Sequence, residues 1–103
     1  MNKLSGKWDV VVHTFMGDQF SEHELIADGD TVSGYVMDKG NGNKAEIQEG
    51  KIDGNIISYK FTIKIPIGEM EFLMEGELKE DGCICGNSSN AMGSFEYDAQ
   101  KEN

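Results

Sequence analysis

The sequence predicts an all-β protein, an eight-stranded antiparallel up-and-down meander that closes into a small barrel. Apolar and polar residues alternate along several runs, which is the period of half-buried antiparallel strands. Turn signals divide the chain at nearly even intervals. No stretch of the chain carries the three-to-four-residue apolar spacing of an amphipathic helix. A length of 103 residues suits one domain, so we expect a single β-barrel domain over residues 1–103.

The first predicted strand shows the alternation most clearly. Trp8, Val10 and Val12 share one parity, and Asp9 and His13 take the other. A strand with this pattern turns its apolar face toward a core and its polar face toward solvent. The same alternation recurs at 32–36, 57–63 and 72–78.

Short turns separate the predicted strands. Asp-Gly pairs favour two-residue hairpin turns, because both residues accept the positive φ that such turns require. These pairs lie at 28–29, 53–54 and 81–82; other glycine-containing turns lie at 16–18, 67–69 and 91–93, and a polar loop lies at 39–43. Glu49-Gly50 falls inside a strand and predicts a β-bulge. The eight predicted strands cover residues 6–16, 18–27, 31–38, 44–52, 55–65, 69–79, 83–89 and 94–100.

Two features favour a closed barrel over an open sheet. An open eight-stranded sheet would expose two unpaired edges, and closure removes both of them. The segment 8–18 also resembles the segment 59–69, a weak internal repeat that suggests two four-stranded halves related by a pseudo-twofold axis. An eight-stranded barrel encloses an interior just wide enough for side chains or one small ligand.

The composition excludes two classes of partner. The chain has 19 acidic and 9 basic residues, a net charge of −10 with neutral histidines. Such a surface repels phosphate backbones and anionic membranes, so we expect no nucleic-acid partner and no membrane partner. No apolar run is long enough for a membrane helix, and the N-terminal segment lacks the apolar region of a signal peptide. We therefore expect a cytoplasmic protein.

The two cysteines, Cys83 and Cys85, have the outward parity of a predicted strand. Their side chains would lie about 7 Å apart, a poor geometry for a disulfide that fits a reducing compartment. Two cysteines and two histidines without a second Cys pair also make a poor zinc site. We predict no metal site and no cofactor. A nucleophilic Cys–His pair is excluded as well, since His23 has inward parity.

The parity of each run defines the side chains that point into the barrel. Trp8 is expected to fill a closed end. The predicted inward positions are Trp8, Val10, Val12, Thr14, Ser21, His23, Leu25, Val32, Gly34, Val36, Ala45, Ile47, Ile57, Tyr59, Phe61, Ile63, Phe72, Met74, Gly76, Leu78, Ile84, Gly86, Ser88, Phe95 and Tyr97.

His23 is the residue best suited to chemistry. A neutral histidine inside an apolar barrel, close to Tyr59 or Tyr97, could act as a general base or orient a polar group of a ligand. The alternative is a buried histidine satisfied by a neighbouring hydroxyl. Phe20 and Ile26 have the opposite parity, and a one-residue shift of this strand would move His23 to the surface.

The other interior candidates are aromatic or flexible side chains. Tyrosine offers an apolar ring with a polar hydroxyl, and methionine adapts to irregular space. Gly34, Gly76 and Gly86 at inward positions either leave room for a ligand or permit close packing. We expect a ligand to contact Tyr59, Phe61, Phe72, Met74, Tyr97 and His23.

The outer wall has acidic and apolar positions. Outward carboxylates such as Glu71, Glu75 and Glu77 predict a solvated face rather than an acid–base pair. Apolar residues with outward parity suggest a surface for a second copy or a partner enzyme, although isolated exposed apolar residues are also common. These outward residues are Val11, Tyr35, Met37 and Leu73.

Three stretches of the chain resemble a known group of proteins. They are Gly6-Lys7-Trp8-Asp9-Val10 with Met16-Gly17-Asp18, the stretch 49–59, and Met92-Gly93-Ser94-Phe95. The meander with its early Gly-Lys-Trp resembles a minimal calycin, the group of lipocalin, fatty-acid-binding and avidin-like barrels. More closely, nearly the whole chain is similar to a small bacterial module found alone or attached to amidohydrolase-type enzymes. The resemblance implies a barrel with room for a small apolar ligand, and its motifs are structural rather than catalytic.

Three functions are consistent with these patterns. The first is binding of a small, mostly apolar molecule that enters through an open end, without catalysis. The second is an accessory module that docks on an enzyme or forms a homodimer through its outer wall. The third is a small lyase or isomerase that uses His23 with a tyrosine. A strongly anionic ligand is disfavoured, because the barrel is acidic and no Arg or Lys has inward parity.

Overall fold

The computed structural model describes residues 4–39, 42–65 and 68–102. Every regular element in these ranges is a β-strand, as the alternating sequence predicts. None of the residues in them belongs to a helix long and apolar enough to cross a membrane. The strands are β1 (Gly6–Thr14), β2 (Gly17–Asp28), β3 (Thr31–Asp38), β4 (Lys44–Glu46), β5 (Gln48–Asp53), β6 (Ile56–Ile65), β7 (Gly68–Leu78), β8 (Ile84–Asn90) and β9 (Gly93–Lys101).

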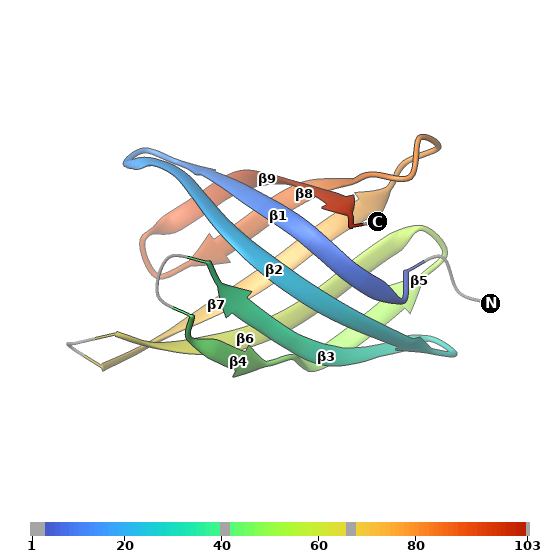
Figure 1. Cartoon of the computed structure of the whole chain (residues 1–103), viewed down its shortest axis with the longest axis horizontal. Coiled ribbons are helices and arrows are strands. Elements are labelled where there is room, and N and C mark those ends of the chain that lie inside the picture. The colour runs from blue at the N-terminus through green and yellow to red at the C-terminus, as the bar shows by residue number, and fades with distance from the viewer. Residues whose placement is uncertain (1–3, 40–41, 66–67, 103) are drawn as a thin grey trace.

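Eight of these strands close into an antiparallel barrel (Figure 1). The ring runs in the order β1, β2, β3, β5, β6, β7, β8 and β9, and β9 pairs again with β1. The closing pair extends from Trp8 opposite Lys101 to His13 opposite Glu96. The short β4 pairs with β3 outside this ring. The predicted fold class, an eight-stranded antiparallel barrel, is confirmed.

The predicted fourth strand, residues 44–52, is divided in two. β4 and β5 flank Ile47, whose side chain is buried and whose N–H donates to the Gly34 carbonyl at 2.9 Å. The β5–β6 register then shifts around Glu49, which has a φ of 50°. This shift is the β-bulge that the sequence predicts. A continuous strand over 44–52 is the wrong prediction, because the ladder is interrupted at Ile47 and again at the bulge.

The first hairpin turn begins earlier than predicted. β1 ends at Thr14 and not at residue 16, because the Thr14 hydroxyl donates to the Gly17 carbonyl at 2.6 Å and accepts from the Met16 N–H at 3.2 Å. Gly17 has a φ of 108°, and Gly68, its counterpart in the internal repeat, has a φ of 140°. Each glycine begins the second strand of a long antiparallel pair, so the repeat marks equivalent positions in the barrel.

Side chains of the predicted inward parity form the core. His23 is 1% exposed, whereas Phe20 and Ile26 point outward and are 59% and 51% exposed. The second strand therefore has the predicted register, without a one-residue shift. The largest fully buried side chains are Trp8, His23, Leu25, Val36, Ile57, Met74, Ser88 and Tyr97.

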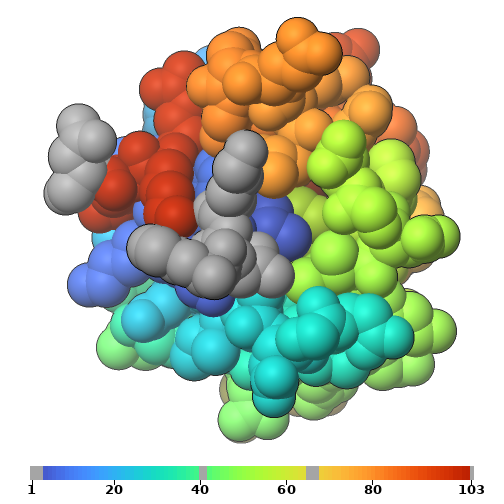
Figure 2. All heavy atoms as spheres, turned by 90° about the vertical axis from the view of Figure 1, so that its right-hand side faces the viewer, coloured from blue at the N-terminus to red at the C-terminus, as the bar shows by residue number. Residues whose placement is uncertain are grey.

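Trp8 closes one end of the barrel, as predicted. Its side chain is 1% exposed, and its indole N–H donates to the Leu4 carbonyl at 2.9 Å. Figure 2 shows this end, where the β2–β3, β5–β6 and β7–β8 connections and the end of β9 surround N-terminal atoms in dark blue. The buried segment around Leu4 and Trp8 thus fills the interior at this end.

The inward glycines permit close packing. A Cβ atom at Gly76 would overlap the Tyr97 hydroxyl, because the tyrosine ring occupies that space. Gly34 has a φ of 123° and lies against the Glu24 carbonyl of the neighbouring strand, and Gly86 is in similar contact with the backbone of β7. Of the two interpretations of these glycines, the structure supports close packing and not empty space.

Candidate functional site

The end of the barrel opposite Trp8 contains a cavity of about 130 Å³. We call this end the mouth; the β1–β2 turn, the β8–β9 turn and the C-terminal end of β3 lie on this side of the barrel (Figure 1). About half of the lining residues are apolar, and these are Val12, Phe20, Val36, Phe61, Ile63, Phe72, Met74 and Phe95. The polar lining residues are Thr14, Gln19, Ser21, His23, Asp38, Ser88 and Asn90, and several of them lie at strand ends.

The structure brings together four of the six predicted ligand contacts. His23, Phe61, Phe72 and Met74 line the cavity. Tyr59 and Tyr97 are buried, at 3% and 2% exposure, but lie outside this lining. Contact of these six residues with a ligand stays a prediction.

Sequence reasoning missed the polar residues at the mouth. Gln19, Asp38 and Asn90 lie at strand ends and line the cavity, although polar residues at such positions are usually assigned to solvent. Their parity could have identified them, since each continues the inward series of its strand. Thr14 and Ser88 have the predicted inward parity and also line the cavity, but their type gave no indication of a ligand site.

Two hydrogen bonds hold the His23 ring inside the barrel. Its Nδ1 atom lies 2.6 Å from the Tyr59 hydroxyl oxygen, and its Nε2 atom lies 2.9 Å from the Ser21 hydroxyl oxygen. A neutral imidazole has one donor N–H and one acceptor nitrogen, so one hydroxyl donates to the ring and the other accepts from it. The three side chains form a hydrogen-bonded chain from the core to the cavity wall.

Burial keeps the side chains of His23 and Tyr59 uncharged. The pKa of His23 is lowered to about 3, because the imidazolium would lose its solvation inside the barrel. Burial, with a smaller effect of the nearby Tyr97, raises the pKa of Tyr59 well above its ordinary value. At neutral pH both side chains are therefore neutral.

The arrangement is suited to hydrogen bonding and poorly suited to proton abstraction. A general base works best when its pKa is near the working pH, and the pKa of His23 lies far below it. Both ring nitrogens are also occupied. His23 is buried and bonded to two hydroxyls, which is the geometry that the interpretation of a satisfied buried histidine expects. Ser21 lines the cavity, and its hydroxyl has capacity for a hydrogen bond beyond the one to His23.

Aromatic rings form part of the cavity wall. The Phe61 and Phe72 rings are stacked, with centroids 5.1 Å apart and an angle of 8° between their planes. The His23 ring meets Phe61 edge to face, at 5.7 Å and 79°. These contacts fix the orientation of the wall, because each ring is held by its neighbour.

Apolar side chains are also exposed at the mouth. Phe15, Met16 and Met92 are each more than half exposed, and they lie in the β1–β2 and β8–β9 turns. The Phe15 ring lies 6.0 Å from that of Phe95, which lines the cavity. Exposed apolar surface therefore continues into the cavity wall.

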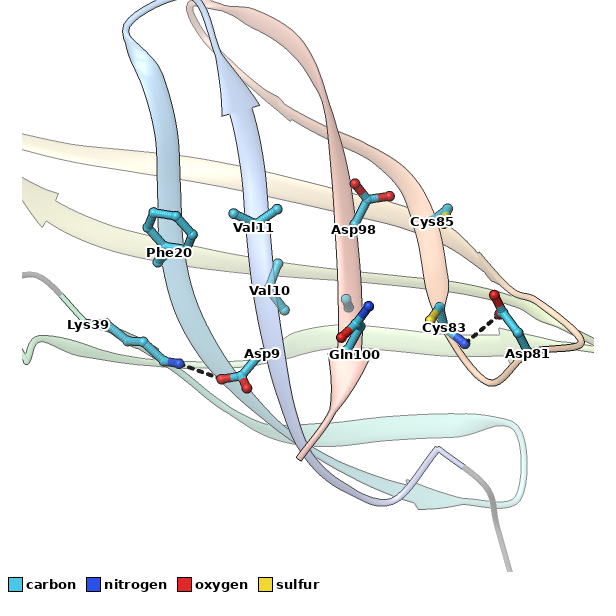
Figure 3. A pocket seen from close by; sticks show the side chains of 11 residues that line it. Asp9, Val10, Val11, Phe20, Lys39, Asp81, Cys83, Cys85, Asp98 and Gln100 are labelled. Carbon is cyan, nitrogen blue, oxygen red and sulfur yellow. Dashed lines mark hydrogen bonds and ion pairs between the residues drawn. The ribbon is translucent and has the colours of Figure 1, made fainter. Parts of the chain in front are cut away.

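A second, open depression of about 480 Å³ lies on the outer wall over β2, β1, β9 and β8 (Figure 3). Phe20, Val11, Asp98 and Cys85 lie in register across these four strands. Of the outward apolar residues that the sequence identifies, Val11 lines this depression. Phe20 on β2 is exposed and its neighbour Val11 on β1 is half-buried.

The thiols of this depression are not activated. Cys83 and Cys85 are free, and burial and nearby carboxylates raise the pKa of both, which favours the unreactive protonated thiol. Asp98 lies 2.8 Å from the Nε2 atom of His13, whose Nδ1 atom lies 3.0 Å from Asp18. Within the described ranges, no three His, Cys, Asp or Glu residues are arranged to hold a metal ion.

Comparison with known proteins yields no match to this chain, whether with family models, curated proteins or solved structures. The calycin resemblance thus rests on the sequence patterns described above. The structure supports the part of that resemblance that concerns architecture, an eight-stranded antiparallel barrel with one filled end.

Proposed function

We propose that this protein binds a small, mostly apolar and uncharged molecule in the cavity at the mouth of its barrel. The single observation that carries the proposal is the cavity itself. Protein interiors are normally packed to the density of organic crystals, yet about 130 Å³ stays open here beside buried aromatic side chains. An apolar wall with a few polar groups at defined positions is typical of small-molecule sites.

The volume limits the ligand to a few heavy atoms. An engineered apolar cavity of roughly 150 Å³ holds one benzene molecule, whereas sites for drug-sized ligands occupy roughly 300–1,000 Å³. A long acyl chain or a fused ring system would not fit the present cavity of about 130 Å³. The ligand would therefore be smaller than those held by deep, lidded barrels.

The charges around the cavity favour an uncharged ligand. His23 and Tyr59 are neutral, and Asp38 lies among the lining residues at the opening. The net charge of −10 adds a field that repels anions. An anionic group inside the cavity would lose hydration without gaining a cationic partner among the described lining residues, and a cationic group would lose its hydration with Asp38 as its one lining carboxylate.

A bulky side chain at the opening tests this proposal without disturbing the core. Gln19 is exposed and lines the mouth, so Gln19→Trp would place a large ring over the cavity. We expect toluene and 1-butanol to shift the amide NMR signals of cavity residues in the native protein, and to bind at least about tenfold more weakly to the variant.

The matched control is Gln48→Trp, since Gln48 is exposed on β5 and does not line the cavity. This variant is expected to bind both probes as the native protein does. Absence of any cavity shift in the native protein at millimolar probe concentrations would refute the proposed binding function.

We also propose that the protein is related to the calycin-like bacterial modules and resides in the cytoplasm. The order of the barrel strands and the early Gly6-Lys7-Trp8 are consistent with the first part. Free thiols at Cys83 and Cys85 favour the second, because secreted proteins seldom keep unpaired cysteines.

The outer depression favours a second candidate function, docking of a partner enzyme or of a second copy. Phe20 is 59% exposed beside Val11, an apolar pair on an otherwise acidic wall. If a second copy binds there, light scattering after size exclusion should give about twice 11.4 kDa, and Phe20→Glu should restore the monomer. A monomeric native protein that copurifies with no enzyme would count against this candidate.

A further inference from the structure

We propose that the cavity ligand is a single six-membered aromatic ring with one hydroxyl group, the chemistry of a simple phenol. This inference rests on the proposed binding function and names its ligand class. It follows from the size of the cavity, from the rings that form its wall and from the neutral hydroxyl that faces it.

The cavity size selects a single ring. At about 130 Å³, the space is slightly smaller than the roughly 150 Å³ apolar cavity that accepts benzene. Thr14, Gln19 and Asn90 also line the cavity, so one substituent of the ring can lie near polar groups. A second fused ring would have to displace buried side chains such as Met74.

The aromatic wall distinguishes a flat ring from a saturated one. Phe61 and Phe72 are stacked at 5.1 Å, and the His23 ring meets Phe61 edge to face. An aromatic guest can extend this arrangement by offset stacking or by an edge-to-face contact, whereas a saturated ring of similar size cannot. The Met74 sulfur, fully buried in the same wall, also favours an aromatic neighbour.

The ligand hydroxyl has a partner in Ser21. Ser21 lines the cavity, and its hydroxyl shares a hydrogen bond of 2.9 Å with His23, which is held in turn by Tyr59 at 2.6 Å. A serine hydroxyl has one donor and two acceptor sites, so one bond to His23 leaves others for a ligand. The hydrogen bonds from Ser21 to His23 and from His23 to Tyr59 already order the Ser21 side chain, so binding would cost little side-chain entropy at this contact.

The same surroundings disfavour an anionic ring. Among the described residues that line the cavity there is no Lys or Arg, and there is one carboxylate, that of Asp38. A benzoate would therefore meet a carboxylate without meeting a cation. A phenol has the ordinary pKa of about 10 of a tyrosine side chain, so it stays neutral at pH 7.

Calorimetry with a matched probe series tests the ligand class. The probes are phenol, cyclohexanol, toluene, benzoate and benzylamine, each titrated into the native protein, Ser21→Ala and Ser33→Ala. Ser33 is exposed on β3 and serves as the control for loss of a serine hydroxyl. We expect phenol to bind the native protein most tightly and cyclohexanol about tenfold more weakly. Ser21→Ala is expected to weaken phenol about tenfold, to leave toluene within about twofold, and Ser33→Ala to change neither.

The outcomes distinguish the proposed phenol class of ligand from the more general proposal that the cavity binds a small apolar molecule. Equal affinity for cyclohexanol and phenol would overturn the aromatic class while leaving small-molecule binding intact. Tighter binding of benzoate or benzylamine than of phenol would overturn the neutral ligand. Binding of no probe, toluene included, would overturn the proposed function itself. The ranking in the native protein decides the class even if Ser21→Ala proves unstable.

Discussion

His23 lies between two hydroxyls in its neutral form, and its pKa is about 3 in the folded protein against about 6.5 in an unfolded chain. Below pH 6.5 the unfolded state takes up a proton that the folded state does not. The folded-state pKa is thus depressed, and the contribution of His23 to stability is complete above pH 6.5 and is lost as the pH falls toward 3. The buried neutral His23 therefore lowers the stability of the barrel as the pH falls below 6.5.

We expect the free energy of unfolding of the native protein to fall more steeply between pH 6 and pH 4 than that of His23→Gln. The carboxylates titrate in both proteins and cancel in the comparison, which leaves a difference of about 1 kcal/mol per pH unit. Urea denaturation at several pH values measures it. At pH 7 the variant should be less stable by about 1–3 kcal/mol, because it leaves Tyr59 or Ser21 imperfectly paired.

The matched control is His13→Gln. His13 is exposed, and hydrogen bonds to Asp98 and Asp18 raise its pKa, so its contribution has the opposite sign. That contribution is present below the unfolded pKa and is lost as the pH rises through the higher folded value. Parallel pH profiles for the native protein and His23→Gln would contradict the assignment of a depressed pKa to the buried histidine.

At the scale of the strands, the close approach of β7, β8 and β9 determines where glycine is required. Gly76 of β7 and Tyr97 of β9 both point into the barrel and are separated by Gly86 of β8. The Tyr97 hydroxyl occupies the space that a side chain at Gly76 would take. The two residues together fill one volume of the core, so their substitutions should not be independent.

We expect Gly76→Ala to lower the free energy of unfolding by about 1–3 kcal/mol, because the added methyl group overpacks the core. In a Tyr97→Phe background the loss should be smaller, since the hydroxyl nearest to the new methyl group is absent. A double-mutant cycle by urea denaturation measures the coupling. Additive effects of the two substitutions would show that the Tyr97 hydroxyl does not restrict Gly76.

The extent to which the sequence predicts the structure also differs between elements. Parity correctly predicts that Gly76 and Tyr97 both point inward, but it does not predict that the tyrosine fills the space beside the glycine. That outcome depends on rotamers and on the distance between strands. The break at Ile47, whose N–H donates to the Gly34 carbonyl of β3, likewise depends on the tertiary structure and is not encoded in a local pattern. The cavity also could not be predicted from a local pattern. Parity predicts that His23 points into the barrel, but the volume left open beside it depends on how the side chains pack.

The whole molecule concentrates a net charge of −10 within a radius of gyration of 12.8 Å. Several lysines pair with carboxylates on the surface, among them Lys39 with Asp9 and Lys60 with Glu49. Exposed pairs of this kind contribute little, and the unpaired acidic excess repels itself in the compact state. Salt should therefore stabilise the protein by screening that repulsion.

We expect the thermal midpoint at pH 7 to rise by about 2–5 °C between roughly 10 and 300 mM NaCl, as the screening length shortens from about 30 Å to less than 10 Å. Calorimetry or circular dichroism measures the midpoint. Near pH 4.4, where the net charge vanishes, the same salt should have little effect. A midpoint that is unchanged or lowered by salt at pH 7 would mean that ion pairs outweigh the general repulsion.

The position of Trp8 has a practical consequence for folding experiments. It is the single tryptophan of the chain, and it pairs with Lys101, whose ammonium lies 5.9 Å from the indole ring, at the seam between the first and last strands of the barrel. That seam joins the residues most distant along the chain, so its formation carries the largest loop-closure entropy. Trp8 fluorescence therefore reports closure of the barrel through pairing of β1 with β9, at the end remote from the mouth. This intrinsic signal distinguishes closure of the barrel from binding of a ligand in its cavity.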